Sequence, residues 1–219
     1  ILCVSRFQLV FAVLLAVFTY ISLQKLFHPG WLFGLFVVMI PFYLILTVAR
    51  SHNIEYLNGI FEMKRASMPI FISQPYIYIA NNYENFDCLV KALPAHTWGI
   101  RMLFPVWALT GLKFLYPYLV SFPIYVDKTE LTTVTLIYDA YYDFGIIGVL
   151  VFACILGAVC FFLVEKLREM KNPMGYLFYG QMAIYMMLSF FTTWFSNPTT
   201  WFYFLVTAVL TFYCSVSRR

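Results

Sequence analysis

Two aspartates, Asp139 and Asp143, stand at the edge of a long apolar stretch, in the segment YDAYYDFG (138–145). If this segment is the first part of a helix, a spacing of four residues places both carboxylates on one face. Two neighbouring acids beside an apolar region suit proton transfer, so either of them could act as a general base. The alternative is a capping role, because an acid at a helix N-terminus binds free N–H groups there. The residues alone leave both roles open.

Four arginines could supply the opposite charge. Arg6 and Arg50 flank two apolar runs, and Arg65 and Arg101 lie in the long segment that separates the second run from the third. An arginine holds phosphate through a planar fork of N–H donors, so these four side chains together would suit a pyrophosphate group. The alternative for each arginine is contact with lipid headgroups.

The same long segment offers two further acid–base candidates, Glu84 and His96, among many tyrosines and tryptophans. Aromatic side chains mixed with charges suit a ligand with sugar-like and anionic parts, although an aromatic belt at a membrane surface has the same composition. The five cysteines form no CxxC pair and no His/Cys cluster with metal-ligand spacing. We therefore expect neither a metal nor another cofactor.

The composition indicates which elements must position these residues. The chain has 219 residues, of which 63% are hydrophobic and 11% charged, against roughly 45–50% and about 25% in soluble domains. The hydrocarbon layer of a membrane is about 30 Å thick and takes ~20 apolar residues in a helix. Open strands cannot cross it, because their backbone groups would lack partners. The sequence therefore predicts an all-α, polytopic bundle of transmembrane helices. The net charge of +4 is spread over the flanks of the apolar runs, which argues against a nucleic-acid surface.

Five segments are long enough to span the membrane, and we expect them to form a single membrane domain over residues 1–219. They are 7–24, 31–49, 144–164, 175–196 and 201–217. The chain starts at Ile1 without the basic region of a signal peptide, so we interpret it as the C-terminal part of a longer polypeptide.

Short basic connections set the orientation. The connection at 165–172 and the C-terminus fall on the cytoplasmic side, and the loop at 50–143 falls on the opposite side; the basic residues concerned are Lys166, Arg168, Lys171, Arg218 and Arg219. Two apolar segments in the outer loop, 69–80 and 101–126, are short or broken by prolines. We expect both to lie on the membrane surface or to re-enter it without crossing; the alternative is that both cross as a pair, which leaves the orientation of the other spans unchanged.

Two motifs resemble the O-antigen polymerase and ligase superfamily. The pair Ser5-Arg6 opens the first apolar run, and TLIYDAYYDFGIIG (135–148) leads into the third run. The second motif is similar to the branch of oligosaccharide repeat unit polymerases. The resemblance implies a GT-C-like, metal-independent glycosyltransferase of the bacterial inner membrane. Such enzymes move a growing glycan from undecaprenyl pyrophosphate onto a lipid-linked repeat unit, on the extracytoplasmic side.

The resemblance also implies roles for single residues. Arg6 matches an arginine that contacts pyrophosphate, and Asp143 falls in a motif position to which no role is carried over. The His-Asn pair of the ligase branch does not occur here, which disfavours a ligase and leaves the base open among Asp143, Asp139, Glu84 and His96. Implied partners are undecaprenyl-pyrophosphate-linked glycans, membrane lipid and a chain-length regulator. The alternative is a transporter or flippase subunit, but its ionisable residues would lie at the membrane midplane, whereas these lie at the outer rim.

Overall fold

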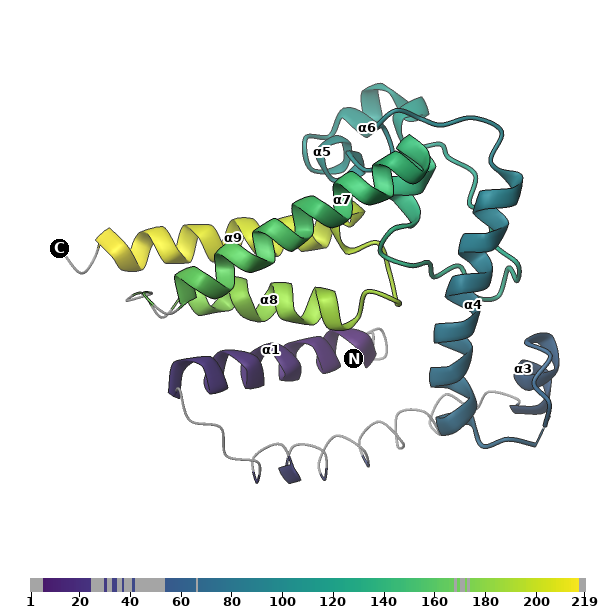
Figure 1. Cartoon of the computed structure of the whole chain (residues 1–219), viewed down its shortest axis with the longest axis horizontal. Coiled ribbons are helices and arrows are strands. Elements are labelled where there is room, and N and C mark those ends of the chain that lie inside the picture. Colours follow the sequence, from purple (N-terminus) through teal and green to yellow (C-terminus); the bar gives the residue numbers. More distant parts are fainter. Residues whose placement is uncertain are drawn as a thin grey trace. The chain divides into compact units, whose positions relative to one another are not determined.

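The structure is a computed structural model of the chain, and it describes residues 6–24, 54–65, 67–167 and 174–216, with a few single residues between these ranges. The described residues form helices, turns and extended loops, with no β-strand among them. The chain divides into two compact units, Ile1–Ala80 and Asn81–Arg219. Figure 1 labels the helices of both units and colours them by their position in the sequence.

The first unit contains α1 (Arg6–Gln24) and the short α3 (Ile54–Ile60). Helix α1 coincides with the predicted span 7–24, and the predicted span 31–49 lies almost wholly outside the described residues. After α3 the chain turns at Glu62, whose φ is +50°. The buried Asn58 donates from Nδ2 to the carbonyl oxygen of Met68 at 2.9 Å, which holds this turn.

Helix α4 (Ile70–Ala92) carries the chain from the first unit into the second. Its first half is the apolar segment 69–80, and its second half bears three buried asparagines, Asn81, Asn82 and Asn85. Among the described residues, α4 is not one of the helices that are long and apolar enough to cross a membrane, and the segment 69–80 forms one end of it.

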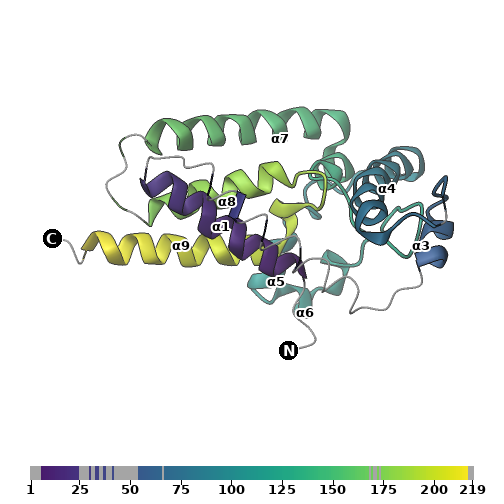
Figure 2. The same ribbon diagram turned by 90° about the horizontal axis from the view of Figure 1, so that it is seen from below.

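The second unit is built around three helices, α7 (Tyr138–Leu167), α8 (Gly175–Met187) and α9 (Pro198–Val216). Helix α8 contacts both of the others, and Figures 1 and 2 show the three running alongside one another. Because the chain reverses between successive helices, the start of α7, the end of α8 and the start of α9 meet at one end of the group. The candidate site lies at this end.

Helices α7 and α9 are long and apolar enough to span a membrane. The most apolar 18-residue window of α7 is not buried at all, and only 11% of that of α9 is buried. The core helix of a soluble protein would bury this surface, so the exposure favours a lipid environment over water. In the described part of α1, the apolar stretch Phe11–Leu23 is shorter. The prediction of an all-helical fold is confirmed for the described residues, whereas five spans are not.

The predicted span 175–196 is not one helix, because α8 ends at Met187. Three carbonyl groups beyond this point accept hydrogen bonds, two of them from distant segments. Leu188 O accepts from the Trp194 indole at 3.0 Å, Ser189 O from Leu136 N at 2.8 Å, and Phe190 O from Asn82 Nδ2 at 2.6 Å. These bonds replace the helical ones, so an apolar sequence that could continue the helix turns back instead.

The segment 101–126 contains α5 (Phe104–Leu109), α6 (Leu112–Leu115), the 3₁₀ turn η1 (Pro117–Leu119) and an extended stretch. Its longest helix has six residues, too few to cross a membrane. Pro105 sits in the first turn of α5, where a missing N–H is harmless. Helix α5 contacts α9 and the 3₁₀ turn η2 (Trp194–Ser196), which places this segment over the end of the three-helix group.

Candidate functional site

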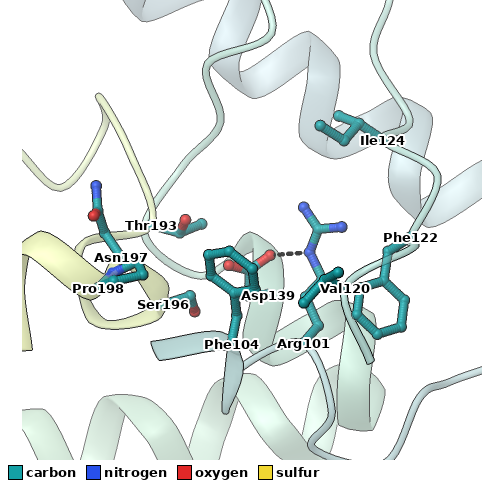
Figure 3. Close-up of a pocket in the computed structure, with 10 residues that line it drawn as sticks. All are labelled: Arg101, Phe104, Val120, Phe122, Ile124, Asp139, Thr193, Ser196, Asn197 and Pro198. Carbon is teal, nitrogen blue, oxygen red and sulfur yellow. Dashed lines mark hydrogen bonds and ion pairs between the residues drawn. The ribbon is translucent and has the colours of Figure 1, made fainter. Parts of the chain in front are cut away.

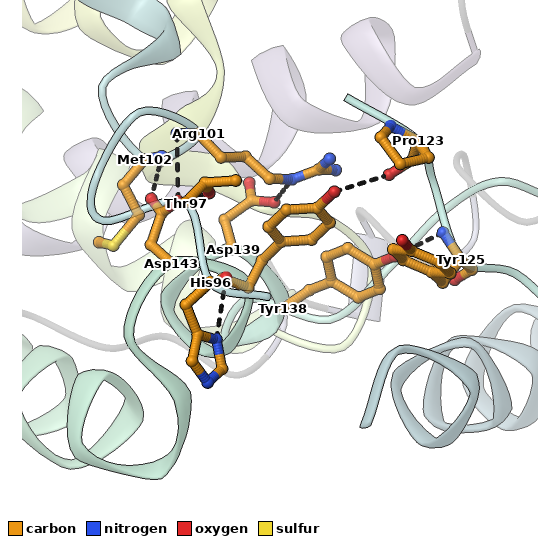
Figure 4. Close-up of polar contacts among 10 residues, drawn as sticks. His96, Thr97, Arg101, Met102, Pro123, Tyr125, Tyr138, Asp139 and Asp143 are labelled. Atoms are coloured by element: carbon orange, nitrogen blue, oxygen red, sulfur yellow. Dashed lines mark hydrogen bonds and ion pairs between the residues drawn. The ribbon is translucent and has the colours of Figure 1, made fainter. Parts of the chain in front are cut away.

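Asp143 fastens the loop 97–102 to the start of α7. Its carboxylate is fully buried. It accepts the hydroxyl of Thr97, the backbone N–H of Arg101 at 3.2 Å and the backbone N–H of Met102 at 2.7 Å (Figure 4). The Asp143 carbonyl also accepts Trp98 N at 3.2 Å. Three donors of one loop therefore bind the Asp143 carboxylate, and no surface of this side chain is open to a ligand.

Asp139, one turn earlier on the same face, binds the side chain of that loop. Its carboxylate forms an ion pair with Nε of Arg101. The Arg101 side chain is 14% exposed and that of Asp139 is 5% exposed. The sequence prediction that the two aspartates share a helix face is consistent with this geometry, and the two carboxylates bind different atoms of Arg101.

Two tyrosines of the same helix lie beneath the guanidinium group. The Cζ atom of Arg101 is 5.2 Å from the ring centroid of Tyr138 and 4.6 Å from that of Tyr142, within the range of a cation–π interaction. The Tyr138 hydroxyl exchanges two hydrogen bonds of 2.9 Å with the backbone of Tyr125, and the Tyr142 hydroxyl donates to Pro123 O at 3.3 Å. Rings and carboxylate together fix the direction of Arg101.

A kink at Gly145 separates this first part of α7 from its apolar remainder. Gly145 has φ +63° and ψ −149°, a conformation that is essentially restricted to glycine. The His96 ring lies against it, since an added Cβ would be 3.0 Å from His96 Nε2. His96 Nδ1 lies 3.2 Å from Tyr142 O; because a carbonyl oxygen only accepts, Nδ1 is the donor. His96 is thereby oriented at the kink, beside the loop that Asp143 holds.

Arg101 and Asp139 line a cavity of about 370 Å³. The opposite side of this cavity comes from the connection between α8 and α9 (Figure 3). The lining residues are Arg101, Phe104, Val120, Phe122, Ile124, Asp139, Thr193, Ser196, Asn197 and Pro198. One guanidinium and one carboxylate thus face a mixture of neutral polar groups and aromatic or aliphatic side chains.

The three buried asparagines of α4 hold the chain that leads into this site. Asn85 donates to Thr133 O at 2.8 Å and accepts from Asp127 N at 2.8 Å. Asn82 accepts the Thr133 hydroxyl at 2.7 Å and donates to Phe190 O. One helix therefore holds both the extended segment that leads into α7 and the chain that follows α8.

The remaining predicted site residues are not gathered here. Glu84 is exposed on α4, and Arg65 is exposed in the first unit. Arg6 begins α1, but its side chain lies outside the described part, as does Arg50 altogether. The structure therefore brings together Arg101, Asp139 and Asp143, with His96 at the edge, and the convergence of four arginines stays a prediction.

Within the described residues, no group of three or more His, Cys, Asp or Glu side chains is arranged to hold a metal ion. The charged groups of the site instead bind one another and the backbone.

Several residues of the site could not be identified as functional from the sequence. Tyr138 and Tyr142 resemble part of an aromatic belt, Thr193 falls within the predicted span 175–196, and Ser196 and Asn197 resemble a turn between spans. The asparagines alone had a usable signal, since residues 81, 82 and 85 of a helix fall on one side.

Comparison with protein-family models, with curated proteins and with solved structures finds no match for this chain.

Proposed function

We propose that this protein is a membrane glycosyltransferase that polymerises lipid-linked oligosaccharide repeat units into a bacterial surface polysaccharide. The observation that carries the proposal is the Arg101–Asp139 ion pair, which lines a cavity at the start of the apolar helix α7. A reaction on a lipid-linked sugar needs its charged groups at such a place, where the lipid tail stays in hydrocarbon and the sugar stays outside.

The proposed orientation places the cavity on the extracytoplasmic side of the bacterial inner membrane. Lys166 lies at the far end of α7, and basic residues accumulate on the cytoplasmic side of membrane proteins. A multi-pass arrangement with further spans belongs to the proposal, beyond the two apolar helices α7 and α9.

The chemistry assigns one task to each member of the ion pair. The oxygen of the acceptor hydroxyl attacks the anomeric carbon of the donor glycan, and Asp139 takes the proton of this hydroxyl. The bond between that carbon and the pyrophosphate oxygen breaks, and its electron pair leaves with undecaprenyl pyrophosphate. Arg101 stabilises the negative charge that develops on this leaving group. The proposal includes no metal and no other cofactor.

Arg101 has donors left for this task. Of the five N–H donors of a guanidinium group, Nε–H binds Asp139, and Figure 3 shows the two terminal nitrogens directed away from that carboxylate. A pyrophosphate oxygen at these nitrogens would draw the guanidinium charge away from Asp139.

Asp143 has a supporting role in this proposal. Because it is fully buried and binds the loop 97–102, it positions Arg101 rather than touching substrate. The contribution of Arg6 to pyrophosphate binding, from the resemblance described above, remains part of the proposal.

The test uses the protein in its host cell, with lipid-linked glycan separated by length on a gel. We expect Asp139→Asn to reduce the ladder of chain lengths to a single repeat unit, with normal amounts of protein in the membrane. Asp87→Asn is the matched control, since Asp87 forms an exposed pair with Lys91 on α4. An unchanged ladder in Asp139→Asn would reduce the ion pair to a structural role. Loss of even the single unit from the outer face would favour the transporter.

A further inference from the structure

The connection between α8 and α9 forms one wall of the cavity that Arg101 and Asp139 line. Thr193, Ser196 and Asn197 contribute a hydroxyl, a second hydroxyl and an amide to this wall. All three belong to a stretch of six residues, 193–198, that lies more than fifty positions beyond Asp139 in the sequence.

The backbone of this wall is held in place by its neighbours. Trp194 is buried, and its indole stacks on Tyr185 with the ring centroids 5.0 Å apart. The indole N–H donates to Leu188 O at 3.0 Å. Asn197 Oδ1 accepts Thr199 N at 2.9 Å and caps the first turn of α9. The side-chain NH₂ group of Asn197 is not needed for this cap, so it remains available to a ligand.

The lining combines four kinds of group that a sugar ring uses. Hydroxyls and an amide can donate to and accept from ring hydroxyls, and the Asp139 carboxylate can accept from one more. Phe104 and Phe122 supply aromatic surface for the apolar face of a ring. The volume of about 370 Å³ lies at the lower end of the range for small-molecule sites, about 300–1,000 Å³.

The charges of the lining residues disfavour a phosphate group beside this wall. The guanidinium of Arg101 is already balanced by Asp139, and the other polar lining groups are neutral. An anion lying against Thr193, Ser196 and Asn197 would also face the Asp139 carboxylate without a further cation among the lining residues. A neutral ligand meets no such opposition.

We propose that this cavity binds a neutral pyranose ring of the acceptor glycan, and that the segment 193–198 selects which pattern of ring hydroxyls fits. The inference rests on the proposed function and adds the recognition element to it. Figure 3 draws the Asp139 carboxylate between the guanidinium of Arg101 and this segment. An acceptor ring bound against the segment would therefore present a hydroxyl to Asp139, with the leaving group on the side of Arg101.

Binding of simple sugars tests the inference without requiring polymerisation. The probes are methyl pyranosides of gluco, galacto, manno and N-acetylamino type, and binding to the purified full-length protein in detergent is followed by saturation-transfer NMR. The variants are Thr193→Val, Ser196→Ala and Asn197→Asp, of which the last keeps the oxygen that caps α9. Thr192→Val is the control, because Thr192 precedes the segment and does not line the cavity.

We expect at least one pyranoside to bind. Its affinity should fall about 3- to 10-fold in Thr193→Val and Ser196→Ala, the loss of one hydrogen bond, and stay unchanged in Thr192→Val. Thermal unfolding of each variant separates loss of binding from loss of fold. The inference is overturned if no pyranoside binds, if the variants bind as the wild type does, or if they lose inorganic pyrophosphate (followed by ³¹P NMR) in place of the sugar. Sugar binding together with a normal glycan ladder in Asp139→Asn would refute the proposed function alone.

Discussion

Asp139 and Asp143 both bind Arg101, the first through its guanidinium Nε and the second through its backbone N–H. The two carboxylates lie one helical turn apart, and Arg101 is 38 residues from Asp139 in the sequence. One residue is thus fixed at both ends by one helix face. This relationship divides the work of the two acids: Asp143 places the loop, and Asp139 remains at the cavity.

The role of Asp143 can be tested through stability. Asp143→Ala removes the acceptor for the Thr97 hydroxyl and for two backbone N–H groups. A buried donor left without a partner costs about 1–3 kcal/mol, so we expect the free energy of unfolding to fall by about 2–4 kcal/mol. The measurement is thermal unfolding of the purified protein by tryptophan fluorescence. Asp87→Ala should change little, because exposed ion pairs contribute about 0–1 kcal/mol. Equal stability of the two variants would show that other contacts hold the loop.

The kink in α7 depends on two glycines. Gly145→Ala places a side chain at φ +63°, and Gly148→Ala places a Cβ 2.4 Å from Ala140 O. The backbone strain at Gly145 and the steric clash at Gly148 each cost about 1–3 kcal/mol. We expect both variants to unfold at lower temperature and to give shorter glycan ladders. Gly157→Ala is the matched control, since a Cβ there has nothing within 4 Å. Wild-type behaviour of Gly145→Ala would mean that α7 runs straight.

The apolar helices could be predicted because a membrane span depends on a continuous run of apolar residues in the sequence. The predicted span 144–164 lies within α7, and 201–217 lies almost wholly within α9. The end of α8 could not be predicted. Residues 188–196 are as apolar as a helix requires, and the chain turns there because Leu136, Trp194 and Asn82 donate to its carbonyls. Leu136 and Asn82 belong to distant segments of the chain, and a local pattern does not contain these two donors.

The sequence predicted the two acids and one arginine of the site, but not which acid pairs with the side chain of that arginine. Spacing put Asp139 and Asp143 on one face, and composition marked Arg101 as one of four candidates. Which carboxylate faces the cavity depends on how the loop 97–102 folds over α7. That path is decided by the positive φ of Trp98 and Gly99 and by bonds to the carboxylate of Asp143, which only the folded chain displays.

The asparagine cluster of α4 predicts that a single substitution there strongly lowers the stability of the second unit. Asn82→Leu removes the donor to Phe190 O and the acceptor of the Thr133 hydroxyl, and Asn82 is fully buried. Two broken partners at about 1–3 kcal/mol each should destabilise the second unit strongly, as measured by thermal unfolding. Glu84→Leu, on the exposed side of the same helix, serves as control. Comparable unfolding temperatures for the two variants would contradict this scaffold.

The thiol of Cys88 offers a test by pH. Burial raises the pKa of Cys88, and the negative charges of Asp127 and Asp87 add to the rise. Because the thiolate is the reactive form, alkylation by N-ethylmaleimide should accelerate at higher pH than for glutathione. The rate is measured in a variant whose other cysteines are replaced by alanine. Asp127→Asn removes one negative charge and should shift the profile to lower pH. A profile equal to that of glutathione, unmoved by Asp127→Asn, would contradict the described surroundings of Cys88.

The central claim is that the Arg101–Asp139 pair carries out glycosyl transfer, and the most direct measurement uses purified protein with lipid-linked repeat units in detergent. The wild type should join two units and release one undecaprenyl pyrophosphate for each bond formed. Asp139→Asn keeps an oxygen for the Nε–H of Arg101, so it should fold normally but react about 10²- to 10⁴-fold more slowly, the usual contribution of a general base. A folded Asp139→Asn protein that forms bonds and releases carrier at the wild-type rate would contradict the account.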